Sequence, residues 1–204
     1  MPVLQPSEYD VNYFDGYLNP TNAHSAGYNK YDEWKRVCSD IVPIANCTGE
    51  FFTDLMQYYN ILGFLNNKKV LEIGCAKAYG IAWLRDNGIQ AWGLDCSAYA
   101  ISQARADIQQ YLTVGDARSY LINYSKNQFN VLYTRFFLEC ISDTDLPPLI
   151  QQMNRVGFLQ IHHINSTVNT GYYNLHPISW WLAQPFKNGT IFVVDNDVQN
   201  PYEV

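Results

Sequence analysis

Residues 69–95 constrain the fold of this chain more than any other stretch. An apolar run containing Val70, Leu71 and Ile73 ends in a turn of small residues, and a helical stretch leads to a second apolar run that ends in Asp95. This order is typical of a β-α-β unit, in which the two parallel strands end at the same edge of a sheet. The pattern therefore predicts a nucleotide-binding unit.

The turn after the first strand reads Gly-Cys-Ala-Lys-Ala, and its small side chains let a ligand approach the backbone. We expect Gly74, Cys75 and Ala76 to contact a bound nucleotide through this backbone. Asp95 lies about 20 residues further on, where a carboxylate accepts hydrogen bonds from the two hydroxyls of a ribose. Asp95 is therefore the predicted ribose ligand.

The turn also indicates which nucleotide is bound. A dinucleotide fold favours G-x-G-x-x-G, whereas the corresponding positions here are Gly74, Ala76 and Tyr79. Glu72 would repel a pyrophosphate but would attract a sulfonium cation and an ammonium group. S-adenosylmethionine is therefore favoured over a nicotinamide cofactor.

Five segments together resemble a class I S-adenosylmethionine-dependent methyltransferase, and most closely the branch with a GCAKG-like first motif. They are Leu71–Ala78, Gly93–Ile101, Val114–Ala117, Phe129–Glu139 and Asn174–Leu182. Three departures stand out: Ala78 replaces a glycine, Cys140 stands where many relatives carry histidine, and no acid-Pro-Pro-Tyr motif follows the fourth strand. The last departure argues against the amine methylases of nucleic acid.

The resemblance implies roles for further residues in cofactor binding. Glu72 would lie at the end of the first strand and Cys96 in a cofactor turn. Asp116 would accept from the adenine amino group, and the Ala117 amide would lie beside it. Thr134 and Arg135 would form the pocket floor, and Tyr28 would close an N-terminal aromatic lid. Alternatives stay open, because Glu72 could cap a helix, Asp116 could form an Asx turn, and Arg135 could pair with Glu139.

Histidines near the end of the fifth predicted strand are the candidates for a catalytic base. Adjacent strand residues face opposite sides, so at most one of His162 and His163 should enter the cleft, and His163 is preferred. His176 follows on the next loop. Neither their spacing nor any nearby CxxC pair supports a metal site, so we expect none.

Periodicity predicts an α/β fold, a Rossmann-like three-layer sandwich with a mostly parallel central sheet and helices on both faces. The expected strands are 69–74, 91–95, 111–114, 129–135, 157–163 and 191–195. The expected helices are 79–87, 98–106, 145–155 and 178–184. We expect one domain over 1–204, with an N-terminal arm and helices over 1–66 and the Rossmann-like core over 67–204.

Composition narrows the partners. The net charge of −6 gives no basic footprint for a phosphate backbone, so bulk nucleic acid is an unexpected partner. Five cysteines without a CxxC pair, no leader-like N-terminus and no long apolar run favour a soluble cytoplasmic protein that does not bind a membrane. The oligomeric state is left open.

The predicted function is transfer of a methyl group from S-adenosylmethionine to an oxygen or nitrogen atom of a small-molecule or glycan acceptor. Two alternatives remain: an NAD-dependent oxidoreductase on a Rossmann fold, and a non-catalytic S-adenosylmethionine-binding subunit.

Overall fold

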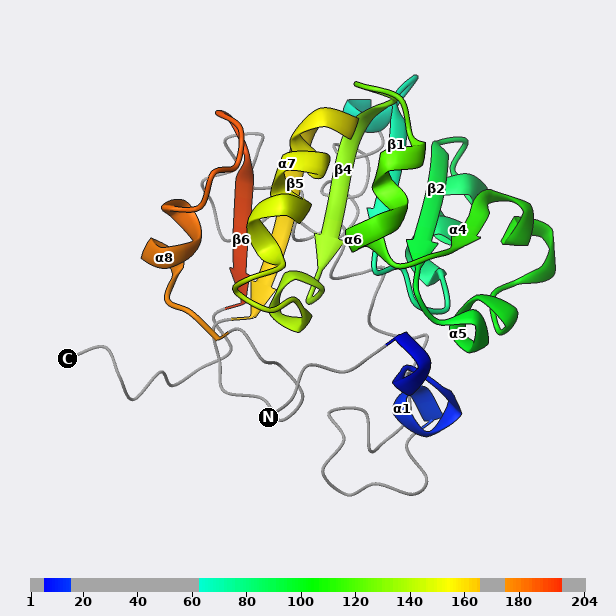
Figure 1. Cartoon of the computed structure of the whole chain (residues 1–204). Coiled ribbons are helices and arrows are strands. Elements are labelled where there is room, and N and C mark those ends of the chain that lie inside the picture. The colour runs from blue at the N-terminus through cyan, green and yellow to red at the C-terminus, as the bar shows by residue number, and fades with distance from the viewer. Residues whose placement is uncertain (1–5, 16–62, 166–174, 196–204) are drawn as a thin grey trace.

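The computed structural model describes residues 6–15, 63–165 and 175–195. Within this part of the chain, six strands form one sheet in the order β3-β2-β1-β4-β5-β6 (Figure 1). The strands are β1 (Lys69–Ile73), β2 (Gln90–Asp95), β3 (Leu112–Val114), β4 (Phe129–Arg135), β5 (Gly157–Asn165) and β6 (Ile191–Asp195). Each neighbouring pair is parallel, so all six strands end at the same edge, called here the carboxyl edge.

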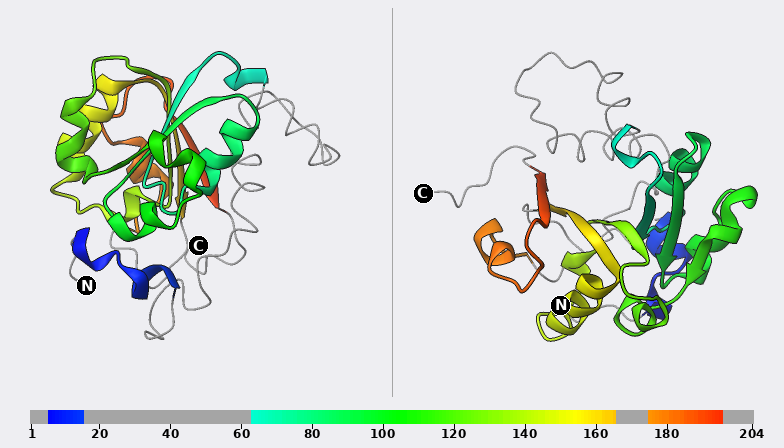
Figure 2. Two further views of the ribbon diagram at one scale, coloured as in Figure 1. Left: turned by 90° about the vertical axis from the view of Figure 1, so that its right-hand side faces the viewer. Right: turned by 90° about the horizontal axis from the view of Figure 1, so that it is seen from above.

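Helices connect the strands and cover both faces of the sheet (Figure 2). They are α1 (Val11–Asp15), α4 (Tyr79–Asp86), α5 (Ala98–Ser102), α6 (Ala117–Tyr120), α7 (Leu146–Val156) and α8 (Ile178–Leu182). Short 3-10 helices add η1 (Pro6–Glu8), η3 (Ala106–Tyr111), η4 (Leu121–Asn123) and η5 (Leu138–Cys140). The predicted three-layer α/β arrangement is confirmed.

Alternation along the strands sends side chains into two separate cores. On β1, Val70 and Glu72 face α4, whereas Leu71 and Ile73 face α7. The core on the α7 side is the larger of the two. Helix α7 contributes five buried residues at helical spacing: Leu146, Leu149, Ile150, Met153 and Val156. Parallel strands covered on both faces explain the nearly continuous apolar runs in the sequence.

In the described residues, β6 pairs with β5 in parallel, with Ile161 opposite Ile191 and Asn165 opposite Asp195. The two N-terminal helices expected before the sheet fall within 16–62 and lie outside the described residues. No helix of the described segments is long and apolar enough to cross a bilayer.

The first described segment, η1 and α1, lies below the carboxyl edge beside α5 (Figure 1). Phe14 is buried against Ala76 and Ala100, and Tyr9, Tyr13 and Tyr99 pack around this contact. The aromatic N-terminal residues thus bind to the sheet edge where the first two crossovers begin.

Candidate functional site

Three loops meet at the carboxyl edge and define the candidate site. The first turn (Gly74–Ala78) follows β1, the second turn (Cys96–Ser97) follows β2, and the third turn (Gly115–Asp116) follows β3. Because β1, β2 and β3 are neighbours in the sheet, the three turns lie side by side. A ligand that is longer than one side chain can contact all three.

The first turn is tightly folded around glycine. Gly74 has φ of +78°, and a Cβ there would lie 2.8 Å from the Phe137 ring. The amides of Gly74 and Cys75 both donate to the Leu94 carbonyl, at 2.8 and 3.3 Å. Ala78, which replaces a glycine of the related motif, also adopts a left-handed backbone with φ of +57°. The turn therefore keeps the glycine-like shape despite the alanine.

Asp95 fastens the first turn to the second. Its Oδ2 accepts a hydrogen bond from the Ala76 amide and its Oδ1 accepts one from the Ser97 amide, each at 2.8 Å. Burial raises the pKa of the Asp95 carboxyl, and these two amide hydrogen bonds act in the opposite direction. The predicted ribose ligand thus lies at the predicted edge, in contact with the predicted turn.

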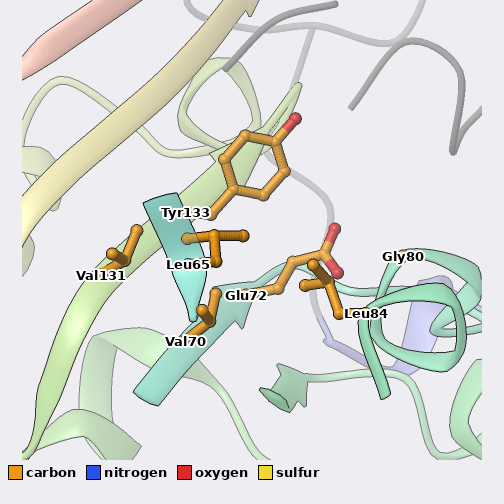
Figure 3. Close-up of a pocket in the computed structure, with 7 residues that line it drawn as sticks. All are labelled: Leu65, Val70, Glu72, Gly80, Leu84, Val131 and Tyr133. Atoms are coloured by element: carbon orange, nitrogen blue, oxygen red, sulfur yellow. The ribbon is translucent and has the colours of Figure 1, made fainter. Parts of the chain in front are cut away.

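Glu72 lies on the face of the sheet that α4 covers. A Cβ on Gly80, in the first turn of α4, would lie 3.1 Å from Glu72 Oε2. Glu72 also lines a small apolar pocket together with Gly80, Leu84 and Tyr133 (Figure 3). A carboxylate beside the first turn of a helix is stabilised by the helix dipole, so the geometry agrees with the helix-capping alternative as well as with a cofactor contact.

Asp116 begins α6 and is held by a nearby arginine. Its Oδ1 accepts from the Arg118 amide at 3.0 Å, which caps the helix, and its Oδ2 accepts from Arg118 Nη2 at 2.6 Å. Burial acts to raise the pKa of Asp116, but the hydrogen bonds from Arg118 prevail and lower it. The Asx alternative noted from the sequence is therefore present, and Ala117 is buried at the start of the helix.

Tyr9 joins the N-terminal segment to the same edge. Its carbonyl accepts a hydrogen bond from the Ser97 hydroxyl, and its phenol lies close to the thiols of Cys96 and Cys140. Cys96 follows β2 and Cys140 lies in η5 after β4, while β1 runs between these two strands. Tyr9 therefore extends across the end of β1. Tyr28, the residue predicted to form the lid, lies outside the described residues.

Thr134, a predicted residue of the pocket floor, and His162 belong to a buried polar chain. Thr134 Oγ1 lies 2.8 Å from His162 Nδ1, and His162 Nε2 lies 3.1 Å from Gln160 Oε1. Gln160 in turn donates to Asn154. His162 has no exposed surface, and burial lowers its pKa to about 3. A neutral, enclosed histidine with both ring nitrogens engaged does not suit a base that must reach a substrate.

His163 points to the opposite face, as alternation requires. Its ring centroid lies 4.6 Å from that of Phe136, and the side chain is buried. Arg135 pairs with His163 in the strand register and lies over the Phe136 ring, with Cζ 4.8 Å from the centroid. Both residues lie at the carboxyl ends of adjacent strands, where the sequence predicted them.

A histidine–carboxylate pair lies on two loops of the same edge. His176 Nε2 is 3.1 Å from Asp143 Oδ1, and the His176 ring stacks on Trp180 with centroids 3.6 Å apart. Unlike His162, His176 keeps part of its side chain exposed. Sequence reasoning noted His176 but not Asp143, because nothing in the spacing of residues 143 and 176 indicates contact. In the described segments, no group of three or more acidic, histidine or cysteine side chains could hold a metal ion.

The parallel sheet, the small-residue turn and the acid at the end of β2 define a Rossmann-like nucleotide-binding domain. Residues 70–157 match the model of a family described as a methyltransferase domain. Over residues 70–157 the core therefore matches a methyltransferase domain, in agreement with the resemblance to class I methyltransferases, whose cofactor is S-adenosylmethionine. No curated protein matches the sequence significantly.

Solved structures similar to this chain include three whose descriptions name methyltransferases. An S-adenosylmethionine-dependent methyltransferase from Archaeoglobus fulgidus is 18% identical, with a TM-score of 0.43, over 48% of this chain and 44% of that one. One from Methanosarcina mazei is 20% identical, with a TM-score of 0.42, over 48% and 52%. The bifunctional kinase-methyltransferase WbdD is 16% identical, with a TM-score of 0.47, over 71% and 31%. The matched regions span about half of the two archaeal proteins and less than a third of WbdD.

Proposed function

We propose that this chain transfers the methyl group of S-adenosylmethionine to an oxygen or nitrogen atom of a small-molecule or glycan acceptor. The single observation that carries the proposal is the contact between Asp95 and the first turn. The acid at the end of β2 accepts a hydrogen bond from the backbone of a turn of small residues, at the edge where nucleotides bind in such sheets. When bound, S-adenosylmethionine supplies a methyl group on a cationic sulfur, which leaves as a neutral thioether.

The residues of the edge would divide the work of binding. Gly74, Cys75 and Ala76 would contact the methionine portion through the backbone, and Asp95 would accept from the ribose hydroxyls.

Cys96 and Ala117 would border the base, while Glu72 and Arg135 would set the charge near the amino acid end. Tyr28 would cover the site. Alignment of the acceptor would supply much of the rate, since good orientation is worth about 7–11 kcal/mol.

A hydroxyl or protonated amine acceptor also needs a base. His163 stands at the end of β5, where acceptors bind in such sheets, and remains a proposed base. His162 was proposed with it, but its burial and hydrogen bonds favour a structural role. The contact with Asp143 makes His176 a further candidate, because a carboxylate orients the imidazole.

One observation favours the oxidoreductase alternative: the order β3-β2-β1-β4-β5-β6 is that of dinucleotide-binding Rossmann folds. The first turn argues the other way. Ala76 and Tyr79 stand where a dinucleotide turn has glycines, and Glu72 adds negative charge near the place of the phosphates. We therefore keep the oxidoreductase, and a non-catalytic binding subunit, as alternatives to be tested.

Thermal denaturation with each cofactor separates these functions. A ligand that binds only the native state, at 100 times its Kd, adds about 2.7 kcal/mol to the free energy of unfolding. We expect S-adenosylmethionine to raise the Tm and NAD to leave it unchanged. Stabilisation by NAD alone would support the oxidoreductase. Binding without release of S-adenosylhomocysteine, on a panel of phenols, amines and sugars, would support the non-catalytic subunit.

The proposal includes the setting of the reaction. We propose one domain over 1–204, with an N-terminal arm and helices over 1–66 and the Rossmann-like core over 67–204. The negative net charge favours a small acceptor over bulk nucleic acid. The described residues contain no helix that could span a bilayer, and a cytoplasmic location remains a proposal.

A further inference from the structure

Arg118 surrounds the carboxylate that the methyltransferase resemblance assigns to adenine recognition. Its backbone amide donates to Asp116 Oδ1 at 3.0 Å, and its Nε lies 3.0 Å from both Oδ1 and Oδ2. Nη2 donates to Oδ2 at 2.6 Å. On the other side of the guanidinium, Nη1 donates to Asp145 Oδ2 at 3.2 Å, which fixes its plane between two acids.

These contacts use most of the accepting capacity of Asp116. An ionised carboxylate offers about four lone-pair directions. Arg118 aims three N–H groups at them, one of which is shared between both oxygens. The forked, paired geometry is also the strong form of an arginine–carboxylate contact. A ligand amine would therefore have to displace part of the Arg118 fork to be accepted by Asp116.

The pair lies where the base of a bound nucleoside would extend. The Gly115 amide donates to the Asp95 carbonyl at 2.8 Å, so the third turn is directly attached to the end of β2. Cys96, in the second turn, lies close enough to Asp95, Asp116 and Arg118 that all three affect its thiol electrostatically. With a ribose at Asp95, as the proposed function requires, the base reaches the neighbourhood of Asp116 and Arg118.

We propose that Arg118 sets the base specificity of this site by withholding the Asp116 carboxylate from the cofactor. The 6-amino group of adenine then gains no acceptor there, and a 6-oxo purine, which accepts hydrogen bonds, meets the N–H groups of Arg118 without penalty. The nucleoside subsite accordingly binds S-inosylhomocysteine about as well as S-adenosylhomocysteine. The inference rests on the proposed function.

Titration calorimetry of the full chain with these two thioethers tests the assignment. We expect the wild-type Kd values to agree within about threefold. The Arg118→Met variant frees Asp116, and it should prefer the adenine compound by at least tenfold, which corresponds to about 1.4 kcal/mol. Arg105→Met is the matched control, because Arg105 also forks onto an aspartate two residues away, Asp107, at an exposed position. It should leave the ratio unchanged.

Three results would overturn the assignment. The first is a wild-type preference of tenfold or more for the adenine compound, and the second is an unchanged ratio in Arg118→Met. If that variant does not fold, Arg118→Lys replaces it, because lysine keeps the charge but loses the fork. A ratio of the two Kd values identical to wild type in Arg118→Lys would then overturn the assignment. The third is wild-type protein that binds neither thioether, which would contradict the proposed function too and is thereby told apart from the first two.

Discussion

The Asp95 carboxylate, at the end of β2, accepts a hydrogen bond from the Ala76 amide in the turn after β1, with Oδ2 2.8 Å from the nitrogen. The same carboxylate holds the Ser97 amide. One side chain therefore fixes the relative position of both turns, and removing it should disturb the structure of the site as well as its contacts.

Replacing Asp95 tests its role as the ribose ligand. Asp95→Ala should abolish the stabilisation by S-adenosylmethionine, because the hydroxyls lose their acceptor and the first turn loses its anchor. The measurement is the Tm with and without ligand. Asp107→Ala removes an exposed aspartate of η3 that pairs with Arg105, and it should respond as wild type does. An unchanged ligand affinity in Asp95→Ala would eliminate the ribose assignment.

Ser97 should couple the second turn to the N-terminal segment. Its hydroxyl accepts from the Ala100 amide as the cap of α5 and donates to the Tyr9 carbonyl. Loss of such a cap costs about 1 kcal/mol, so Ser97→Ala should lower the free energy of unfolding by roughly that amount. Hydrogen exchange at residues 9–14 should also become faster.

Ser102→Ala provides the comparison for that experiment. Ser102 is an exposed serine at the end of the same helix, and its hydroxyl donates only to the nearby Tyr99 carbonyl among the contacts described. It should change neither the stability beyond about 0.5 kcal/mol nor the exchange of residues 9–14. Equal exchange in the two variants would refute the coupling.

Gly93 leaves room for the first turn to pack on β2. A Cβ there would lie 2.6 Å from Cys75 Sγ and 2.9 Å from Leu112 Cδ2. Gly93→Ala should therefore cost about 1–3 kcal/mol in urea denaturation, as overpacked cores do. Cys75→Ala removes the nearest atom, so the double variant should recover part of that loss. If the double variant loses as much free energy of unfolding as the two single variants together, the clash of the new Cβ is not with Cys75.

His162 should make stability depend on pH. Its folded pKa of about 3 lies below the unfolded value near 6.5, so the unfolded chain binds the extra proton between these limits. Stability is full above pH 6.5 and falls as the pH falls toward 3. From pH 7 to pH 5 the histidine should account for a loss of about 2 kcal/mol.

The measurement is urea denaturation at pH 7 and pH 5 for the wild type and for His162→Gln. The glutamine cannot take up a proton, so its free energy of unfolding should vary less between the two pH values by the stated amount. Equal losses in both proteins would show that His162 is not the group responsible.

The strands were predictable because short apolar runs that alternate with helical segments favour a parallel sheet. Residues 129–135 and 191–195 have the predicted bounds, and α4 ends one residue before the prediction. Asp95 was placed correctly because a residue that ends a strand must lie at the carboxyl edge. The short helix α6 escaped notice, since four residues carry too little periodicity to be recognised.

The side-chain partners could not be read in the same way. The engagement of Asp116 by Arg118 depends on a rotamer, although an acid two residues before an arginine at a helix start hints at it. The burial of His162 depends on Phe186 and Phe192, which lie beyond β5 in the sequence and pack against its ring. Such contacts arise only when distant elements are assembled.

The double engagement of Asp95 bears on how any nucleoside can be held. An ionised carboxylate offers about four accepting directions, and the Ala76 and Ser97 amides take one on each oxygen. The hydroxyls of a ribose can therefore bind beside these amides without displacing them. The same side chain can thus keep the two turns together while it receives a sugar.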